Sequence, residues 1–161
     1  MKFRRKIIVI GYGLAFLALF LFYQLQMHEY AGFQKIDIAN AEDKTAEFQY
    51  GVDAPIDSTY IVISGYAYQT FMDYKTIDYK IVLLNKRTGE TFSIKTQPVE
   101  RQDLLKNDTA LHFAKVGLYG RVSKKAGAFS QNYYEICYLI TINNENSYVI
   151  HTGSYMGTAE D

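Results

Sequence analysis

Two hydrophobic patterns divide this chain. A continuous apolar run extends from Ile7 to about Tyr23, whereas apolar and polar residues alternate in segments from residue 47 onward. A continuous run predicts a helix that is apolar on all sides, and alternation with a period of two predicts half-buried β-strands. The sequence therefore predicts one N-terminal helix followed by a separate β-rich domain.

The apolar run is typical of a membrane anchor. It holds about 17 residues, near the lower limit for a helix that spans a bilayer. No small-residue cleavage site and no lipoprotein cysteine follow it, so we expect an uncleaved signal anchor. Basic residues before the run favour a cytoplasmic N-terminus; they are Lys2, Arg4, Arg5 and Lys6.

These features predict the order of segments along the chain. We expect a basic cytoplasmic head at 1–6, a transmembrane anchor at 7–25 and a stalk at 26–46. An extracytoplasmic β-domain at 47–156 and a short tail at 157–161 follow. The predicted location is the plasma membrane, crossed once, with the β-domain outside.

The alternation predicts about seven strands in the β-domain. In 60–68, Ile61, Ile63, Gly65 and Ala67 should share one face, opposite Tyr66 and Tyr68. The other expected strands are 47–52, 78–85, 91–96, the part of 111–123 around GLYGRVS, 133–143 and 147–152. Such short strands predict an antiparallel β-sandwich of the immunoglobulin-like or jelly-roll-like kind.

Three strand details follow from particular residues. Gly89 can take a positive φ in KRTGE, which predicts a hairpin between 78–85 and 91–96. The strand at 133–143 is apolar on both faces and should be central, with Tyr134 and Tyr138 in the core. Gly153 is expected to end the last strand.

Charge and cysteine content exclude some function classes. After the first six residues the chain has 13 basic and 17 acidic residues, a net charge near −4. Nucleic-acid binding needs a basic stripe instead. The single cysteine, Cys137, excludes an internal disulfide. Because it lies in an apolar strand, we interpret it as a core thiol rather than a nucleophile.

The segment PVERQDLLKN, residues 98–107, concentrates charge between two predicted strands. Asp103 can cap a short turn at 104–106, and the planar guanidinium of Arg101 can pair with Asp103 or bridge backbone carbonyls. We interpret this segment as a structural corner. The alternatives are a ligand contact and, third, a catalytic group.

Tyrosines supply the second set of candidate binding residues. Tyr66, Tyr68 and Tyr74 could stack against sugar rings, and the alternative is that most tyrosine rings fill the core with hydroxyls at its rim.

No motif for catalysis or metal binding is recognised. His28, His112 and His151 lie far apart, without the spacing of a metal site, and no nucleophile elbow, phosphate loop or dinucleotide motif occurs. We therefore expect no catalytic residue, metal or cofactor.

Two short motifs carry a resemblance that spans roughly residues 56–153. They are Gly65-Tyr66-Ala67 and Arg101-x-Asp103-Leu104. The chain resembles an extracytoplasmic β-sandwich domain of Gram-positive cell-envelope membrane proteins associated with surface polysaccharides and teichoic acids. That pattern usually has Trp where this chain has Tyr66, and often Pro in place of Gln102.

The resemblance implies a location and a context more than a reaction. We expect a non-enzymatic, membrane-anchored accessory or interaction module of cell-envelope glycopolymer synthesis or modification. Its expected partner is an integral membrane protein of that machinery. The alternative is a glycan-binding module that uses exposed tyrosines, and the third reading is an envelope enzyme with an unrecognised site.

Overall fold

The computed structural model describes residues 2–30, 32–57, 60–69, 76–107, 115–124, 129 and 131–157. The chain divides into two compact units, residues 1–31 and residues 32–161. The first unit contains helix α1 (Lys2–Tyr30), and the second contains the strands of the described residues.

Helix α1 confirms that the N-terminal apolar run is helical. Its large apolar side chains between Tyr12 and Leu25 are all at least half exposed, from 50% for Phe20 to 75% for Tyr12. Among the residues that the structure describes, no helix reaches the length and apolar character that crossing a membrane requires. The transmembrane role of α1 stays a prediction.

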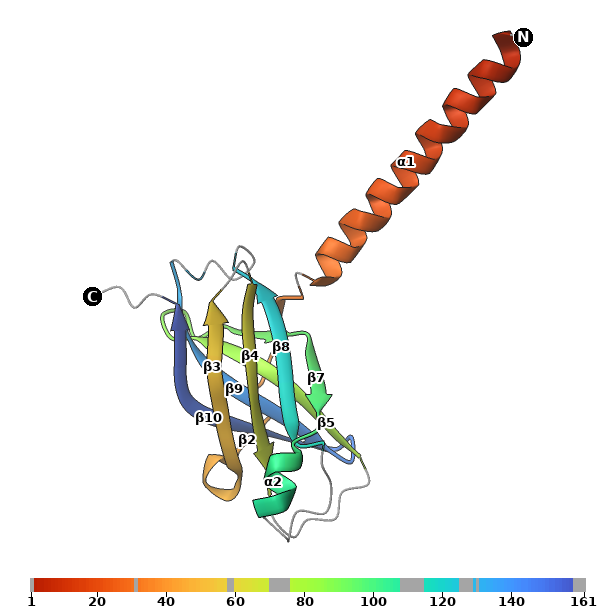
Figure 1. The fold of residues 1–161 in the computed structure, drawn as a ribbon. Helices are drawn as coiled ribbons and strands as arrows, with labels where there is room; N and C mark the ends of the chain where they lie inside the picture. Colours follow the sequence, from red (N-terminus) through yellow and green to blue (C-terminus); the bar gives the residue numbers. More distant parts are fainter. Residues whose placement is uncertain are drawn as a thin grey trace. The chain divides into compact units, whose positions relative to one another are not determined.

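The second unit consists of two β-sheets, which confirms the expected β-sandwich in outline. Sheet A has six strands in the order β1-β6-β5-β9-β10-β2, and sheet B has four in the order β3-β4-β8-β7. Their pairs are antiparallel except β10 with β2. Figure 1 shows β3, β4, β8 and β7 as one layer and β5, β9 and β10 as the other. The finer immunoglobulin-like or jelly-roll-like class stays a prediction.

The elements have the following bounds. Sheet A contains β1 (Gln34–Lys35), β2 (Glu42–Asp43), β5 (Ile77–Asn85), β6 (Thr91–Ile94), β9 (Tyr133–Ile142) and β10 (Asn146–Gly157). Sheet B contains β3 (Gln49–Asp57), β4 (Tyr60–Tyr68), β7 (Thr96–Val99) and β8 (Gly117–Ser123). A 3-10 turn, η1 (Thr45–Glu47), precedes β3, and helix α2 (Gln102–Asn107) follows β7.

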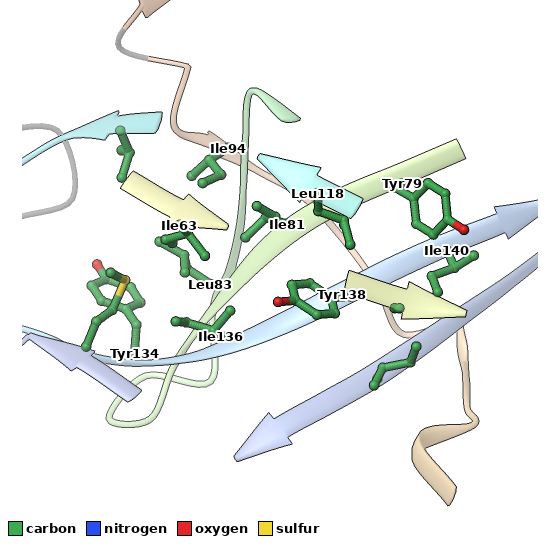
Figure 2. Packing of buried hydrophobic residues seen from close by; sticks show 14 of the residues in the cluster. Ile63, Tyr79, Ile81, Leu83, Ile94, Leu118, Tyr134, Ile136, Tyr138 and Ile140 are labelled. Atoms are coloured by element: carbon green, nitrogen blue, oxygen red, sulfur yellow. The ribbon is translucent and has the colours of Figure 1, made fainter. Parts of the chain in front are cut away.

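The core lies between the two sheets (Figure 2). Ile63 of β4 and Leu118 of β8 pack in one cluster with Ile81 of β5 and with Ile136 and Tyr138 of β9. The alternation predicted for 60–68 is confirmed, because its even-numbered positions up to Tyr66 are more exposed than their odd-numbered neighbours. β9 is central as predicted, between β5 and β10. Tyr134 also lies in the core cluster, at 2% exposure.

A tyrosine hydroxyl ties the sheets together across this core. Tyr138 of sheet A donates a hydrogen bond to the backbone carbonyl of Gly51 in sheet B, at 3.0 Å. A Cβ at Gly65 would lie 2.1 Å from the Tyr138 hydroxyl and 2.3 Å from the Gly51 carbonyl oxygen. Burial raises the pKa of the Tyr138 phenol, so it stays a donor at ordinary pH. Position 65 therefore requires glycine for the close approach of its neighbours.

The predicted hairpin forms, but its second strand is divided between the sheets. Gly89 has a φ of 72°, and the Asn85 side chain accepts hydrogen bonds from the amides of Arg87 and Thr88. The chain then leaves sheet A after Ile94 and enters sheet B at Thr96. The Thr96 hydroxyl accepts from the Ile81 amide at 2.8 Å, which fixes this transition. The alternation of residues 91–96 in the sequence does not indicate this change of sheet.

Gly153 does not end the last strand. β10 continues to Gly157, with a shift of register between His151 and Ser154. Gly153 takes a φ of 67° inside this irregularity. A glycine with a positive φ occurs in β-bulges as well as at strand ends. The prediction that Gly153 ends the strand was wrong because it considered only the second case.

The predicted stalk is too long. Residues 34–35 and 42–43 form β1 and β2 at the two edges of sheet A. Between them, Ile36, Ile38 and Ala41 pack over the apolar outer side of that sheet. The compact unit therefore begins at residue 32 rather than 47. Strands of two residues leave no period-two pattern in a sequence.

Gly65→Ala should destabilise the β-sandwich strongly. The new methyl group would overlap the Tyr138 hydroxyl, so we expect the free energy of unfolding to fall by about 2–4 kcal/mol, from overpacking and the lost hydrogen bond together. Chemical denaturation of the full-length protein measures this. Ser64→Ala, one residue away on the other face, should change stability by less than about 0.5 kcal/mol. Equal stability of Gly65→Ala and the native protein would contradict the inter-sheet role of Tyr138.

Candidate functional site

The candidate site begins with a cross-strand row on the outer face of sheet B. Gly51, Tyr66, Gly117 and Val99 are successive register partners across β3, β4, β8 and β7. A Cβ at Gly51 would lie 2.7 Å from the Tyr66 ring, and a Cβ at Gly117 would lie 2.8 Å from Cγ of Arg101. The two glycines thus form a floor for the side chains of Tyr66 and Arg101.

Arg101 connects three groups above this floor. Its Nε lies 3.0 Å from Oδ1 of Asp103 and its Nη2 lies 2.8 Å from Oδ2, which is a two-pronged ion pair. Its Nη1 lies 3.4 Å from Oδ2 of Asp53 on β3. Its Cζ is 5.0 Å from the ring centroid of Tyr66. The guanidinium therefore joins the start of α2 to β3 and β4.

The hydrogen bonds between Arg101 and Asp103 shift the pKa of each residue in the direction that favours its charged form. The hydrogen bond to Asp103 raises the pKa of Arg101, and the hydrogen bond from Arg101 lowers the pKa of Asp103. The Arg101 side chain is only 20% exposed, whereas Asp103 is 58% exposed. Arg101 is thus the buried member of the pair, and Asp103 lies at the surface.

The geometry agrees with the interpretation of this segment as a structural corner. The Leu104 amide donates to the Arg101 carbonyl at 3.1 Å as α2 begins, and Leu104 packs with Tyr66, Tyr68 and Val116. Figure 1 shows α2 at the end of sheet B where β4 and β7 finish. Arg101 therefore fixes the point at which the chain turns over the outer face.

The predicted tyrosines do not all remain candidates for binding. Tyr66 stays half-buried under Arg101, but Tyr68 is only 4% exposed and its hydroxyl donates to Oε1 of Gln49 at 2.7 Å. Tyr68 lies in one cluster with Tyr66, as their predicted shared face requires, yet Leu104 and Val116 pack in the same cluster and bury its ring. It is not the exposed stacking platform that we expected. Tyr74 lies outside the described residues.

Several further residues of the same face were not predicted from the sequence. Tyr119 of β8 is 38% exposed, and its register partner is Ser64, which also pairs with Asp53. Near the other end of β4, Cζ of Arg121 lies 3.7 Å from the ring centroid of Tyr60. We call this set the tyrosine–arginine face; it consists of Tyr60, Tyr66, Tyr119, Arg101, Arg121 and Asp53.

A second polar cluster lies in sheet A. Sγ of Cys137 is 3.5 Å from Nδ1 of His151, and the same Nδ1 is 3.2 Å from Oε1 of Glu135. The other oxygen of Glu135 is 3.0 Å from Nζ of Lys86. Cys137 is fully buried, as predicted, and burial raises the pKa of its thiol to about 12. The wide sequence spacing of the histidines gave no indication of this cluster.

Register creates the second cluster. Cys137 and His151 are direct partners between β9 and β10, and Glu135 follows two residues away along β9. The sequence indicates that Glu135 and Cys137 share one face of β9, because they are two residues apart. It does not indicate which residue of β10 lies opposite them, since that depends on the strand register.

Comparisons of the chain with family models, with curated proteins and with solved structures find no match. The resemblance to Gram-positive cell-envelope domains therefore stays a prediction.

Arg101→Ala should destabilise the protein in the absence of any ligand. It would remove the guanidinium from Asp103, Asp53 and Tyr66, so we expect a loss of about 1–3 kcal/mol, the scale for a largely buried charged hydrogen-bonding group. Because the pKa of Asp103 is lowered, the contribution of the pair is complete above its ordinary value of 3.8 and disappears as the pH falls through the lower, folded value.

Urea denaturation at several pH values measures both effects. Arg121→Ala is the matched control, because that exposed guanidinium contacts a ring and should contribute at most about 1 kcal/mol. An Arg101→Ala protein as stable as the native one would overturn the corner interpretation.

Proposed function

We propose that this protein is a non-enzymatic, membrane-anchored interaction module that binds a protein partner through its tyrosine–arginine face. One observation carries the proposal: tyrosine and arginine side chains lie together on the outer face of sheet B. Tyr and Arg are enriched among the residues that contribute most to the affinity of protein interfaces.

The face is also pre-organised for binding. Arg101 is held by Asp103, Asp53 and the Tyr66 ring, and Arg121 lies against Tyr60. Side chains that are already fixed lose little conformational entropy when a partner docks. Exposed Arg121 and Tyr119 provide a charged hydrogen-bond donor and an apolar ring to a partner.

The arrangement supports a protein partner better than a glycan. A sugar ring stacks on an open aromatic face. Guanidinium groups lie against Tyr60 and Tyr66, and Tyr68 is covered. Tyr119 is the exposed tyrosine of the described face, and it keeps glycan binding as the second candidate function.

The proposed anchor is α1, and its exposed apolar side chains from Tyr12 to Leu25 support this role. The basic residues at 2–6 support an N-terminus in the cytoplasm and a β-sandwich outside the plasma membrane. β1 begins at Gln34, soon after α1 ends at Tyr30, so an anchored helix would keep the sandwich near the bilayer.

Tethering at a membrane raises the effective concentration of a neighbour, so modest contacts are sufficient. We therefore propose an integral membrane protein as the partner. The Gly65-Tyr66-Ala67 and Arg101-x-Asp103-Leu104 motifs resemble those of cell-envelope domains. On that resemblance, we propose that the partner takes part in cell-envelope glycopolymer synthesis or modification.

Co-purification tests this function. Full-length tagged protein, extracted from membranes of its native host with mild detergent, should carry an integral membrane protein. Tyr119→Ala and Arg121→Glu should each reduce the recovered partner about 10-fold or more, because both remove exposed interface groups. Glu145→Lys, an exposed change of charge in the turn between β9 and β10, is the control and should retain the partner.

Two results would count against the protein partner. Retention of the partner by both face variants would contradict the proposed surface. Binding of a defined wall glycan by the purified full-length protein, lost in Tyr119→Ala, would establish the second candidate instead.

A further inference from the structure

The cluster in sheet A has the composition of a metal site. Glu135, Cys137 and His151 each offer one donor atom, and these atoms lie within 4.8 Å of one another. Thiolate, imidazole and carboxylate are the usual protein ligands of zinc. The donors come from neighbouring strands with fixed pairing, so the cluster does not depend on a loop.

The two donor separations that involve His151 also fit a zinc ion, and the third pair, Sγ of Cys137 and Oε1 of Glu135, lies within 4.8 Å. Zn–S bonds of about 2.3 Å and Zn–N bonds of about 2.0 Å at tetrahedral angles place sulfur and nitrogen about 3.5 Å apart. The observed Sγ–Nδ1 separation is 3.5 Å. The same reasoning places nitrogen and oxygen ligands about 3.3 Å apart, and Nδ1 and Oε1 are separated by 3.2 Å.

Hydrogen bonding alone explains the arrangement less well. A ring nitrogen of histidine carries either one proton or one lone pair, so it makes one good hydrogen bond in the ring plane. Here the thiol and the carboxylate both approach Nδ1. A chain of hydrogen bonds would use the two ring nitrogens separately. A single cation between the three donors would satisfy them all.

The surroundings supply the support that metal ligands usually have. Lys86 contacts the second oxygen of Glu135, which leaves Oε1 toward His151. The backbone amide of His151 donates to Oγ1 of Thr45 at 2.9 Å. The register shift of β10 begins directly after His151, and bulges commonly re-aim side chains beside functional sites. Val82 and Val149 pack in the same apolar cluster as Cys137.

We propose that Oε1 of Glu135, Sγ of Cys137 and Nδ1 of His151 bind one divalent zinc ion. Binding replaces the proton of the Cys137 thiol with the metal, and that proton leaves to solvent. Three protein donors leave one tetrahedral position for water. The ion joins β9 to β10 independently of the tyrosine–arginine face, which lies on the other sheet.

Metal titration of the full-length protein in detergent, after removal of metals by a chelator, tests this site. We expect one zinc ion per chain by calorimetry. Cobalt(II), used as a spectroscopic probe, should give the visible bands of a tetrahedral ion together with a thiolate charge-transfer band. Zinc should raise the melting temperature, because it binds only the folded state tightly.

Variants separate the proposed ligands from chance binding. Cys137→Ser should abolish the charge-transfer band, and His151→Gln should weaken zinc affinity by at least about 100-fold, the upper range for disturbing even outer ligands. His151 is partly exposed, so circular dichroism should show His151→Gln folded. Glu145→Gln, outside the cluster, should bind as the native protein does.

Absence of saturable zinc binding by the native protein would overturn the proposal. A cobalt complex without a thiolate band would overturn it as well, as would native-like zinc affinity in folded His151→Gln. None of these results depends on whether the protein recovers a membrane partner.

Discussion

The hydrogen bond from Tyr138 to the Gly51 carbonyl sets the constraint on which the rest of the sandwich depends. Its 3.0 Å length brings a large side chain of sheet A against the backbone of sheet B, and only glycine at position 65 leaves room for it. Gly51 contributes to both faces of sheet B. Its carbonyl accepts the hydrogen bond from Tyr138, and its lack of a side chain leaves space for the Tyr66 ring. The packing of the core and the geometry of the outer face therefore depend on the same short stretch of backbone.

The two outer faces of the sandwich differ because the chain covers them differently. Residues 36–41 cross the apolar outer side of sheet A and bury Cys137 there. On sheet B, α2 covers the end near Tyr68, while Tyr119 and Arg121 remain exposed. Partner binding is proposed for the outer face of sheet B, and metal binding for the outer face of sheet A, which is covered near Cys137 but leaves Tyr155 45% exposed. Arg101 belongs to the scaffold of the face on sheet B, because its ion pairs and ring contact hold the corner in place.

Local patterns in the sequence predicted the parts of the structure that local contacts determine. The alternation at 60–68, the hairpin at Gly89 and the central strand at 133–142 all follow from nearest-neighbour spacing. The pair Arg101–Asp103 was predictable because its members are two residues apart. Asp53 and the cluster around His151 were not, since register between distant strands brings them together. The short edge strands β1 and β2 were hidden in a polar segment that resembles a stalk.

Site-specific photo-crosslinking tests the central claim, that the tyrosine–arginine face is an interface, most directly. A photoreactive phenylalanine analogue placed at Tyr119 of the full-length protein keeps an aromatic ring at the exposed centre of that face. Illumination of intact membranes should then produce one discrete adduct with an integral membrane protein, whereas the analogue placed at Glu145 should produce none. Absence of an adduct from position 119, or the same adduct from both positions, would contradict the claim.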